Sequence, residues 1–387
     1  MSGTASSQAR HWRTAALALE FVRRRPAPTR RDLAHELGLA SGAASDLVGR
    51  LRAARLVAEA PAAAQGPGRP TTRLHAHPEG PVVLAVDLRH GDWRLAACGI
   101  DGEVEPLVSE RHRTANADAV LRRLRQIVLQ TVQRLDGRVL AVGVAVPGLT
   151  AGTRVLEASM LGWRDVELDA IAAGLPLIAG NDATMAAVAE ARLRPSIGSL
   201  LHLVLEIGIG GALVLDGSPA QGAHGLGGEF GHMPFGDPEE VCGCGARGCW
   251  GLAFDPRLLA PRLGEPEPAD PRGWLRGLLE FPRPGAARRR LREQLAAHLG
   301  RGTAGLVNAL DPDAVTFGGL AGPLRAAAPD AFAGAFAAGL MGAHRPAIPE
   351  VADGQAGEHA TLIGLALAAF DRVLDAQQLA LWASPAA

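Results

Sequence analysis

One histidine and three cysteines lie close together in the middle of the sequence. His232 is followed ten positions later by Cys242, and Cys244 and Cys249 complete the group. Three thiolates and one imidazole form the ligand set of a closed, tetrahedral structural zinc site. The glycines between the cysteines allow the backbone to turn so that the sulfurs converge on one ion. We therefore predict a structural Zn²⁺ with no open position for a catalytic water. A disulfide is the alternative, and it would leave one cysteine unpaired.

The composition of the chain excludes several kinds of catalysis. All 39 of its basic residues are arginine, and it has no tyrosine. Without lysine there can be no phosphate-loop lysine, no Schiff-base lysine and no kinase strand lysine. No tyrosine can act as an acid or a base. With 387 residues, of which 48% are hydrophobic, the chain can build roughly two to three domains with buried cores.

The sequence predicts a protein of the cytoplasm. The residues from Met1 to His11 are polar and small, and no apolar segment of a signal peptide follows them. We find no stretch of about 18 apolar residues that could span a membrane. Four cysteines in a chain of this length do not form a disulfide framework. Cys98 is expected to be a small buried hydrophobic side chain.

Charge is distributed unevenly along the chain. The first 75 residues contain 12 arginines and 5 acidic residues, a balance of +7, whereas the remainder carries a balance of −8. A basic module joined to an acidic body is typical of a nucleic-acid-binding protein with a separate sensing domain. A solvated basic face would carry the same charge. Only the residue pattern inside the module can distinguish it from a nucleic-acid-binding module.

The basic module has the pattern of a helix-turn-helix. We expect helices over Trp12–Arg25, Arg30–Leu37 and Gly42–Ala54. Thr29 and Ser41 are the predicted N-caps of the second and third helices. Two short helices joined by a glycine-containing turn place the second of them in the major groove of DNA. A helical protein-interaction domain is the alternative.

The third helix is expected to read the bases. The small side chains at its exposed N-terminal end, from Ala43 to Asp46, allow close approach but few bidentate base contacts. Arg50, Arg52 and Arg55 are expected to approach phosphates. The residues predicted to contact DNA are Ser41, Ala43, Ala44, Ser45, Arg50 and Arg69.

A β-wing is expected after these helices. Leu56–Ala60 and Thr72–His75 are compatible with two short strands around Gln65–Pro70. The tip, Gly68-Arg69-Pro70, would place Arg69 in a narrow minor groove. Residues 1–75 are therefore assigned to a winged helix-turn-helix DNA-binding domain.

Beyond residue 75, strands alternate with helices. The expected strands are Val82–Asp87, Trp93–Gly99, Leu140–Val146, Leu177–Ala179, Leu200–Leu205, Gly211–Leu215 and Ala314–Phe317. The expected helices are Ala117–Leu135, Ala183–Arg192, Ala286–Leu310 and Glu358–Leu374. This alternation predicts an α/β body of two lobes with a ligand at the mouth between them. Within residues 76–387 we place the lobes at approximately 81–180 and 181–355, with a C-terminal helix over 356–376 that returns to the first lobe.

A series of short motifs accompanies the helix-turn-helix, the Gly-Arg-Pro wing and the cysteine group. They are Val146-Pro147-Gly148, Gly162-Trp163, Asn181-Asp182-Ala183, Gly208-Ile209-Gly210, Glu229-Phe230-Gly231-His232 and Gly318-Gly319. In these motifs the sequence resembles, over essentially the whole chain, the ROK family (repressors, open reading frames and kinases), and specifically its winged-helix transcription regulators. The Glu-x-Gly-His motif combined with Cys-x-Cys-Gly-x-x-Gly-Cys is highly specific. The resemblance implies an actin-like, hexokinase-like two-lobed fold after the winged helix.

The resemblance also implies a sugar pocket in which Asn181, Asp182, Glu229 and His232 contact hydroxyl groups. Carboxylates and amides suit this role because they form paired hydrogen bonds with vicinal hydroxyls. A histidine that binds zinc through one nitrogen keeps the other available, fixed in tautomer and orientation. Two alternatives stay open: Asp182 could cap the helix that begins at Ala183, and Glu229 could be a solvated loop acid.

The phosphate loops of the family's kinases are altered here. Those kinases resemble one another in an Asp-x-Gly-Gly-Thr loop and a Gly-Thr-Gly loop, where this chain has Asp87-Leu88-Arg89-His90-Gly91 and Glu206-Ile207-Gly208. Bulky side chains and a carboxylate replace the small residues that let phosphates reach backbone amides, and phosphoryl transfer depends on such positioning. We expect that ATP binding is lost and that Asp182 is the vestige of a catalytic base. Gly251 replaces a glutamate that the family uses to hold the sugar.

Together these patterns predict a DNA-binding transcription regulator that is not an enzyme, a repressor of carbohydrate-related genes. It would bind a double-stranded DNA operator as a homodimer or homotetramer, because two-fold operators match two-fold proteins. A sugar or sugar phosphate would be its effector, and no membrane partner is expected. Two alternatives stay open: a sugar kinase (ATP-dependent hexose phosphorylation) fused to a DNA-binding domain, and a DNA scaffold that answers to a protein partner.

Overall fold

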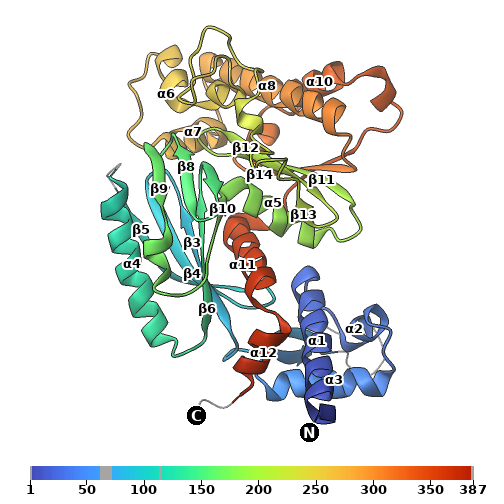
Figure 1. Ribbon diagram of the computed structural model, residues 1–387. Helices are drawn as coiled ribbons and strands as arrows, with labels where there is room; N and C mark the ends of the chain where they lie inside the picture. The colour runs from blue at the N-terminus through green and yellow to red at the C-terminus, as the bar shows by residue number, and fades with distance from the viewer. Residues whose placement is uncertain (1, 62–71, 113–115, 385–387) are drawn as a thin grey trace. The chain divides into compact units, whose positions relative to one another are not determined.

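The computed structural model of the chain describes residues 2–61, 72–112 and 116–384, with side chains from residue 11 onward. The chain forms two compact units (Figure 1). Unit 1 comprises Met1–Met185 and His359–Ala387, and unit 2 comprises Ala186–Glu358. In the described part of the chain, no helix is both long and apolar enough to cross a lipid bilayer.

Three helices and a hairpin form the N-terminal part of unit 1. They are α1 (Ser2–Arg24), α2 (Arg30–Glu36), α3 (Ser41–Ala53) and the antiparallel strands β1 (Val57–Pro61) and β2 (Thr72–Ala76). Thr29 caps α2 as predicted, because its hydroxyl accepts from the Asp32 N–H at 3.1 Å while the Asp32 carboxylate accepts from the Thr29 N–H at 2.8 Å. The prediction for Ser41 was wrong: α3 includes Ser41, and its N-cap is Ala40, which makes no side-chain cap contact.

The surface expected to face DNA is only partly as predicted. Ala44 is 2% exposed and lies on the same face of α3 as Leu47 and Val48, three and four residues further on, which are in the core. Its predicted base contact is therefore corrected, because its side chain points inward. Arg69 and the rest of the predicted wing tip lie outside the described residues. The other candidate contacts are exposed: Ser41, Ala43, Ser45 and Arg50.

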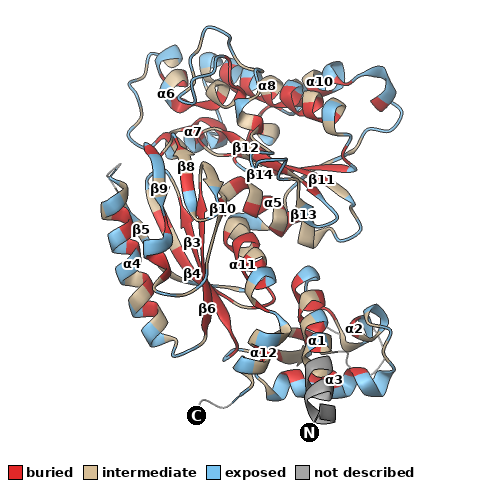
Figure 2. Ribbon diagram, in the orientation of Figure 1, coloured by how far each residue is buried: buried red, intermediate tan, exposed pale blue. Residues whose placement is uncertain are grey.

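The first lobe, also in unit 1, is built on a five-stranded sheet of order β10-β6-β3-β4-β5. Its strands are β3 (Val82–Leu88), β4 (Asp92–Cys98), β5 (Val104–Arg111), β6 (Val139–Val146) and β10 (Leu177–Asn181). β3 and β6 are buried along their whole length (Figure 2), because helices cover both faces of the sheet. Val83 and Ala85 of β3 share a core with α11 (Ala360–Val373), and the alternate residues Leu84 and Val86 share one with α4 (Ala117–Arg134).

A small antiparallel sheet in the first lobe was not predicted. It consists of β7 (Leu149–Ala151), β8 (Arg154–Ala158) and β9 (Trp163–Glu167). Exposed charged side chains, such as those of Arg154 and Glu167, interrupt the apolar alternation in these strands. The sequence therefore gives only a weak strand signal here.

Unit 2 contains a second five-stranded sheet, of order β13-β12-β11-β14-β15. Its strands are β11 (Ser199–Leu205), β12 (Ile209–Leu215), β13 (Ser218–Pro219), β14 (Ala314–Gly319) and β15 (Glu350–Asp353). The helices are most of α5 (Asp182–Leu193), then α6 (Pro256–Leu259), α7 (Pro271–Glu280), α8 (Ala286–Leu310), α9 (Ala321–Ala327) and α10 (Pro329–Gly339). The bounds of α8 are those predicted. Phe317 of β14 and Phe332 of α10 lie in one core with α8.

The end of the chain returns to the N-terminal helices within unit 1. α12 (Ala376–Trp382), which was not predicted, packs against α1. The indole N–H of Trp382 donates to the carbonyl oxygen of Ala54 at 2.8 Å. Arg23 of α1, whose side chain is 5% exposed, forms an ion pair of 2.8 Å with Asp371 of α11. The N-terminal helices therefore share one hydrophobic core with the first lobe and the last two helices.

Candidate functional site

The four predicted metal ligands converge in unit 2. The ligand atoms of His232, Cys242, Cys244 and Cys249 all lie within 4.8 Å of one another. Cys242 Sγ lies 3.7 Å from His232 Nδ1, and Cys244 Sγ lies 3.7 Å from Cys249 Sγ. Tetrahedral zinc with Zn–S bonds of about 2.3 Å would place two sulfurs about 3.8 Å apart. The donor set and its spacing therefore fit a metal ion.

The cysteine loop is a tight turn that brings its sulfurs close to one another. The Cys242 N–H donates to the Ala246 carbonyl oxygen at 2.8 Å, and the Gly245 N–H donates to the Cys242 carbonyl oxygen at 2.9 Å. Gly245 and Gly248 have φ angles of +91° and +68°, in the left-handed region that glycine adopts without steric cost. Burial and the neighbouring sulfurs raise the pKa of the Cys249 thiol to about 12. A cation at the centre would favour the thiolate instead.

Trp250, which follows the last cysteine, anchors this loop to α8. It is fully buried and packs edge-on against Phe235 and Phe254, with ring centroids 5.7 and 6.2 Å away. The ring lies directly on Gly302 of α8, where a Cβ would collide with it. This anchor was not predicted, although a large apolar residue next to a metal ligand is a usable signal in the sequence.

Glu229 lies beside the second nitrogen of His232. Its Oε2 is 3.9 Å from His232 Nε2, so Nδ1 faces the sulfurs and Nε2 faces a carboxylate, as in many zinc-bound histidines. Burial raises the pKa of Glu229, and the nearby His232 opposes that rise. Gly231, between them, lies against the carbonyl oxygen of Ile209 and leaves no room for a Cβ. Gly251 lies beside the Gly231 backbone.

Asn181 and Asp182 lie where β10 ends and α5 begins. Asn181 Oδ1 accepts from the Thr184 N–H at 3.0 Å, and its amide donates to the Gly148 carbonyl oxygen at 3.2 Å. Asp182 Oδ1 accepts from the adjacent Ala183 N–H at 2.8 Å. Asn181 therefore makes the usual N-cap contact, in which a side-chain oxygen accepts from the N–H of the residue three positions further along the chain. These two residues belong to unit 1, and Glu229 and His232 to unit 2; a single sugar pocket formed by all four stays a prediction.

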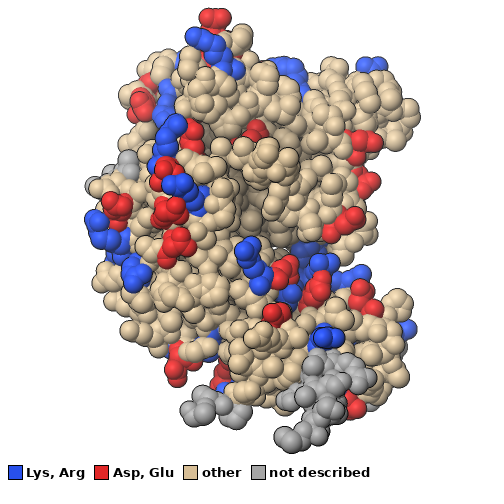
Figure 3. Space-filling model, viewed as in Figure 1, with Lys and Arg blue, Asp and Glu red and all other residues tan. Residues whose placement is uncertain are grey.

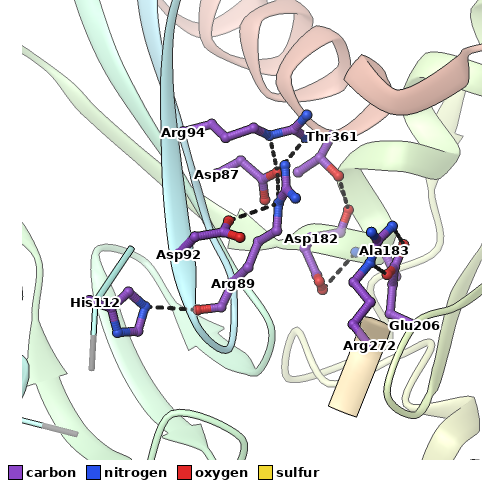
Figure 4. A network of polar contacts seen from close by, with 10 residues as sticks. All are labelled: Asp87, Arg89, Asp92, Arg94, His112, Asp182, Ala183, Glu206, Arg272 and Thr361. Atoms are coloured by element: carbon purple, nitrogen blue, oxygen red, sulfur yellow. Dashed lines mark hydrogen bonds and ion pairs between the residues drawn. The ribbon is translucent and has the colours of Figure 1, made fainter. Parts of the chain in front are cut away.

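Ion pairs join β3 and β4 next to the turn between them, the first of the two loops that the sequence predicts to differ from the family's kinases. Asp87 is 3% exposed and contacts Arg94 Nη2 at 2.7 Å and Arg89 Nε at 3.0 Å through Oδ2 (Figure 4). Arg89 Nε also lies 3.6 Å from Asp92 Oδ1. Asp87 and Arg89 were recognisable in the sequence of this loop, whereas the contribution of Arg94, from the paired strand β4, was not predicted.

The second loop that the sequence predicts to differ also contains an ion pair. Glu206 follows β11, and Arg272 of α7 donates to its Oε1 through Nη2 at 3.1 Å. Arg272 Nε contacts the other carboxylate oxygen. Arg272 thus holds the Glu206 carboxylate in position, and both residues belong to unit 2.

Two of the three arginines expected near DNA phosphates have acidic partners within the protein. Arg52 Nη1 lies 3.2 Å from Glu59, and Arg55 Nη1 lies 2.9 Å from Glu79. On the face shown in Figure 3, arginines lie beside acidic side chains in several places. Arg52 and Arg55 are therefore each already paired with a carboxylate of the protein.

Comparison with known proteins relates the chain to both repressors and kinases. Residues 83–372 match the model of the ROK family. The xylose repressor of Caldicellulosiruptor bescii is 27% identical over 197 residues, 47% of this chain and 48% of that protein. The N-acetylmannosamine kinase of Salmonella typhi is 32% identical over 175 residues, 43% of this chain and 59% of the kinase. The chain thus covers less than two thirds of each of these relatives.

Solved structures show the same architecture. A ROK family transcriptional regulator, a homologue of the E. coli MLC protein, has 21% identity and a TM-score of 0.68 over 97% of this chain and 99% of its own. The ROK hexokinase of Thermus thermophilus has 27% identity and a TM-score of 0.58, over 76% of this chain and 99% of its own. The mixed α/β body has the expected actin/hexokinase-like fold, and α1–α3 with the β1–β2 hairpin are consistent with the winged helix-turn-helix. Because the family model matches residues 83–372, more than half of the chain, the chain belongs to the ROK family.

Proposed function

We propose that the protein is a DNA-binding transcription regulator, a repressor of carbohydrate-related genes. The observation that carries this proposal is the pair α2–α3, followed by the β1–β2 hairpin, with the N-terminal end of α3 exposed apart from Ala44. In a helix-turn-helix the second helix enters the major groove with its N-terminal residues at the base edges. The xylose repressor and the ROK transcriptional regulator among the related proteins support the same role.

We propose further that the sensing domain has lost ATP binding. Phosphate loops bind by presenting backbone N–H groups to the phosphate oxygens. Here Arg89 and Arg94 are engaged with the buried Asp87, and Glu206 places a carboxylate in the second loop. Side-chain bulk, and ion pairs that already engage the arginine donors, oppose the binding of a triphosphate at these positions. Asp182, the residue expected as the base of a kinase, would then be a vestige.

A sugar kinase fused to a DNA-binding domain is the second candidate function. The observation that favours it is the N-acetylmannosamine kinase relative, which is 32% identical over 175 residues. In that case Asp182 would accept the proton of a sugar hydroxyl, and the ion pairs of Asp87 and Glu206 would have to open for ATP. The two candidates differ in one measurable property, the turnover of ATP.

A structural Zn²⁺ is the proposed resident metal. His232 would bind it through Nδ1 and the three cysteines through their sulfurs, a closed set with no position for water. The ion would supply positive charge that keeps the cysteine thiols deprotonated, and its bonds to the sulfurs would fix the cysteine loop. His232 is then held in one tautomer, with Nε2 toward Glu229 and the proposed sugar site.

The proposed effector is a sugar or a sugar phosphate, bound by Asn181, Asp182, Glu229 and His232. A change in DNA affinity requires that the effector binds two conformations of the protein with different affinity. Two-fold DNA operators match two-fold proteins, so we propose a homodimer or homotetramer. The proposed location is the cytoplasm.

The experiment that tests this function has three parts. The zinc-loaded full chain is first used to select duplexes from a random-sequence DNA pool, and enrichment of one sequence is expected. Its affinity for that operator is then measured with and without a panel of sugars and sugar phosphates. ATP consumption is followed with the same panel. Failure to enrich any sequence would refute the regulator, and sugar-dependent ATP turnover would favour the kinase.

A further inference from the structure

Glu59 is a half-buried residue whose carboxylate contacts both helices of the helix-turn-helix and the facing strand. It lies in β1, and 7% of its side chain is exposed. Arg30, the first residue of α2, donates to it through Nε and Nη2 at 2.5 and 2.6 Å. Arg52, near the end of α3, donates at 3.2 Å, and the Thr72 hydroxyl of β2 donates at 2.9 Å. One side chain therefore joins α2, α3, β1 and β2.

Two arginines share this single carboxylate, so the group keeps a net positive charge. The side chains of Arg30 and Arg52 are 41% and 54% exposed, whereas that of Glu59 is 7% exposed. The contact uses the Nε–Nη2 edge of Arg30 and one terminal nitrogen of Arg52. Each guanidinium has further N–H donors that can bind a phosphate oxygen. The hydrogen bonds from Arg30 lower the pKa of Glu59, against the opposing effect of burial, so the carboxylate stays charged.

A nearby ion pair lacks these properties and serves as a control. Arg55 and Glu79 are 2.9 Å apart, but both side chains are 64% exposed. Glu79 lies in the turn after β2 and has one arginine partner in this pair. An exposed pair of this kind holds its members loosely and contributes little energy.

Building on the proposed function, we propose that Glu59 positions Arg30 and Arg52 for DNA phosphates and limits their charge, so that affinity for unrelated DNA stays low. Phosphate contacts supply affinity that does not depend on sequence, whereas base contacts supply the difference between sequences. The Glu59 carboxylate offsets part of the charge of the two arginines, so it weakens the contribution of the phosphate contacts. It does not alter the N-terminal end of α3, where the base contacts are expected. Glu59 thus sets the ratio of operator affinity to affinity for unrelated DNA, which is the quantity that decides occupancy.

The variant Glu59→Gln tests this role because it keeps the size of the side chain and removes its charge. Affinities of the zinc-loaded full chain for the selected operator and for an unrelated duplex are measured by fluorescence anisotropy over a series of salt concentrations. We expect severalfold tighter binding of unrelated DNA and a salt dependence steeper by about 1 in log–log slope. The ratio of the two affinities should fall. Glu79→Gln should change these values less than Glu59→Gln does, because the Arg55–Glu79 pair is 64% exposed on both sides and restrains Arg55 only loosely.

A second variant separates the effect on DNA from any loss of stability. The double variant Glu59→Gln/Arg52→Gln restores the net charge of the wild type, so its salt slope should return toward the wild-type value even if it is less stable. If Glu59→Gln fails to fold, Arg52→Gln alone should give a shallower slope than the wild type.

The outcomes distinguish this role from the proposed function. Equal slopes in the wild type and Glu59→Gln overturn the role of Glu59, as does a slope that stays steep in the double variant. A wild-type protein that selects no operator refutes the regulator and this role with it. A selective wild type with an unchanged Glu59→Gln slope refutes only the role of Glu59.

Discussion

His202 is a buried ionisable residue outside the candidate site. It lies in β11, is 2% exposed, and its Nδ1 is 2.8 Å from Thr316 Oγ1 in β14. Burial lowers its pKa from 6.5 to about 4, with Glu190 opposing the shift and Arg194 adding to it. A histidine held neutral in the folded protein makes the free energy of unfolding depend on pH.

We predict that stability falls as the pH is lowered from about 6.5 to about 4. The unfolded chain takes up a proton at the ordinary histidine pKa of 6.5, whereas folded His202 does so only near 4. The unfolded state therefore gains up to about 3 kcal/mol across this window. Chemical denaturation at a series of pH values measures the effect. His202→Gln should flatten this part of the profile, and an unchanged profile would contradict the prediction.

A second prediction concerns Cys244, whose sulfur lies 3.7 Å from that of Cys249. Cys244→Ala should lower the bound zinc from about one equivalent to a small fraction, because a structural site needs its closed set of four ligands. Thermal stability should fall with the metal. Elemental analysis of dialysed protein measures the zinc. Cys98→Ala is the control, because Cys98 is buried in β4 outside the metal group; full zinc in Cys244→Ala would exclude this assignment.

Among the elements, α8 determines where the cysteine loop lies, because Trp250 packs directly on the Gly302 backbone. Gly302→Ala is predicted to destabilise the protein by about 1–3 kcal/mol, since the added methyl group overpacks a rigid ring. Gly277→Ala in α7 is a matched helical control with open space at the Cβ position, and it should stabilise by about 1 kcal/mol. Denaturation midpoints measure both. Equal effects in the two variants would show that the contact with Trp250 is unimportant.

Elements with a strong apolar pattern were predictable from the sequence, and those built from tertiary contacts were not. α8 and the core strands β3 and β6 carry long apolar patterns, and the structure has them where expected. β7–β9 and α12 are short, so their sequences carry too little periodicity to be recognised. The burial of Ala44 was missed because alanine fits either face of a helix. The ion pairs of Asp87 with Arg94 and of Glu59 with Arg30 join separate elements, and spacing along the chain does not reveal such pairs.

At the scale of the molecule, the N-terminal helices and the last helices of the chain are one structural unit. Leu19 of α1 and Leu51 of α3 lie in the same core as Phe370 and Leu379. The proposed DNA-binding part therefore takes part of its stability from residues at the opposite end of the sequence. Under the proposed function, an effector that shifts α11 would act on the N-terminal helices through this shared core.

The contact of Trp382 with Ala54 provides a test of this dependence. Trp382→Ala should increase hydrogen exchange in α1 and α3, because it removes a hydrogen bond of 2.8 Å and the packing of a large ring. Leu381→Ala, one residue earlier and 62% exposed, should leave exchange unchanged. Equal protection in Trp382→Ala and the wild type would show that the two ends of the chain are stabilised independently.

The shared core has a consequence for synthesis on the ribosome. Chains grow from the N-terminus, and early domains usually fold before later ones emerge. Here the first helices lack part of their packing until α11 and α12 have left the exit tunnel. Premature termination would accordingly yield a chain whose N-terminal helices lack part of their core. If the proposed function holds, such a truncated chain would not bind its operator, and the genes would be expressed instead of permanently silenced.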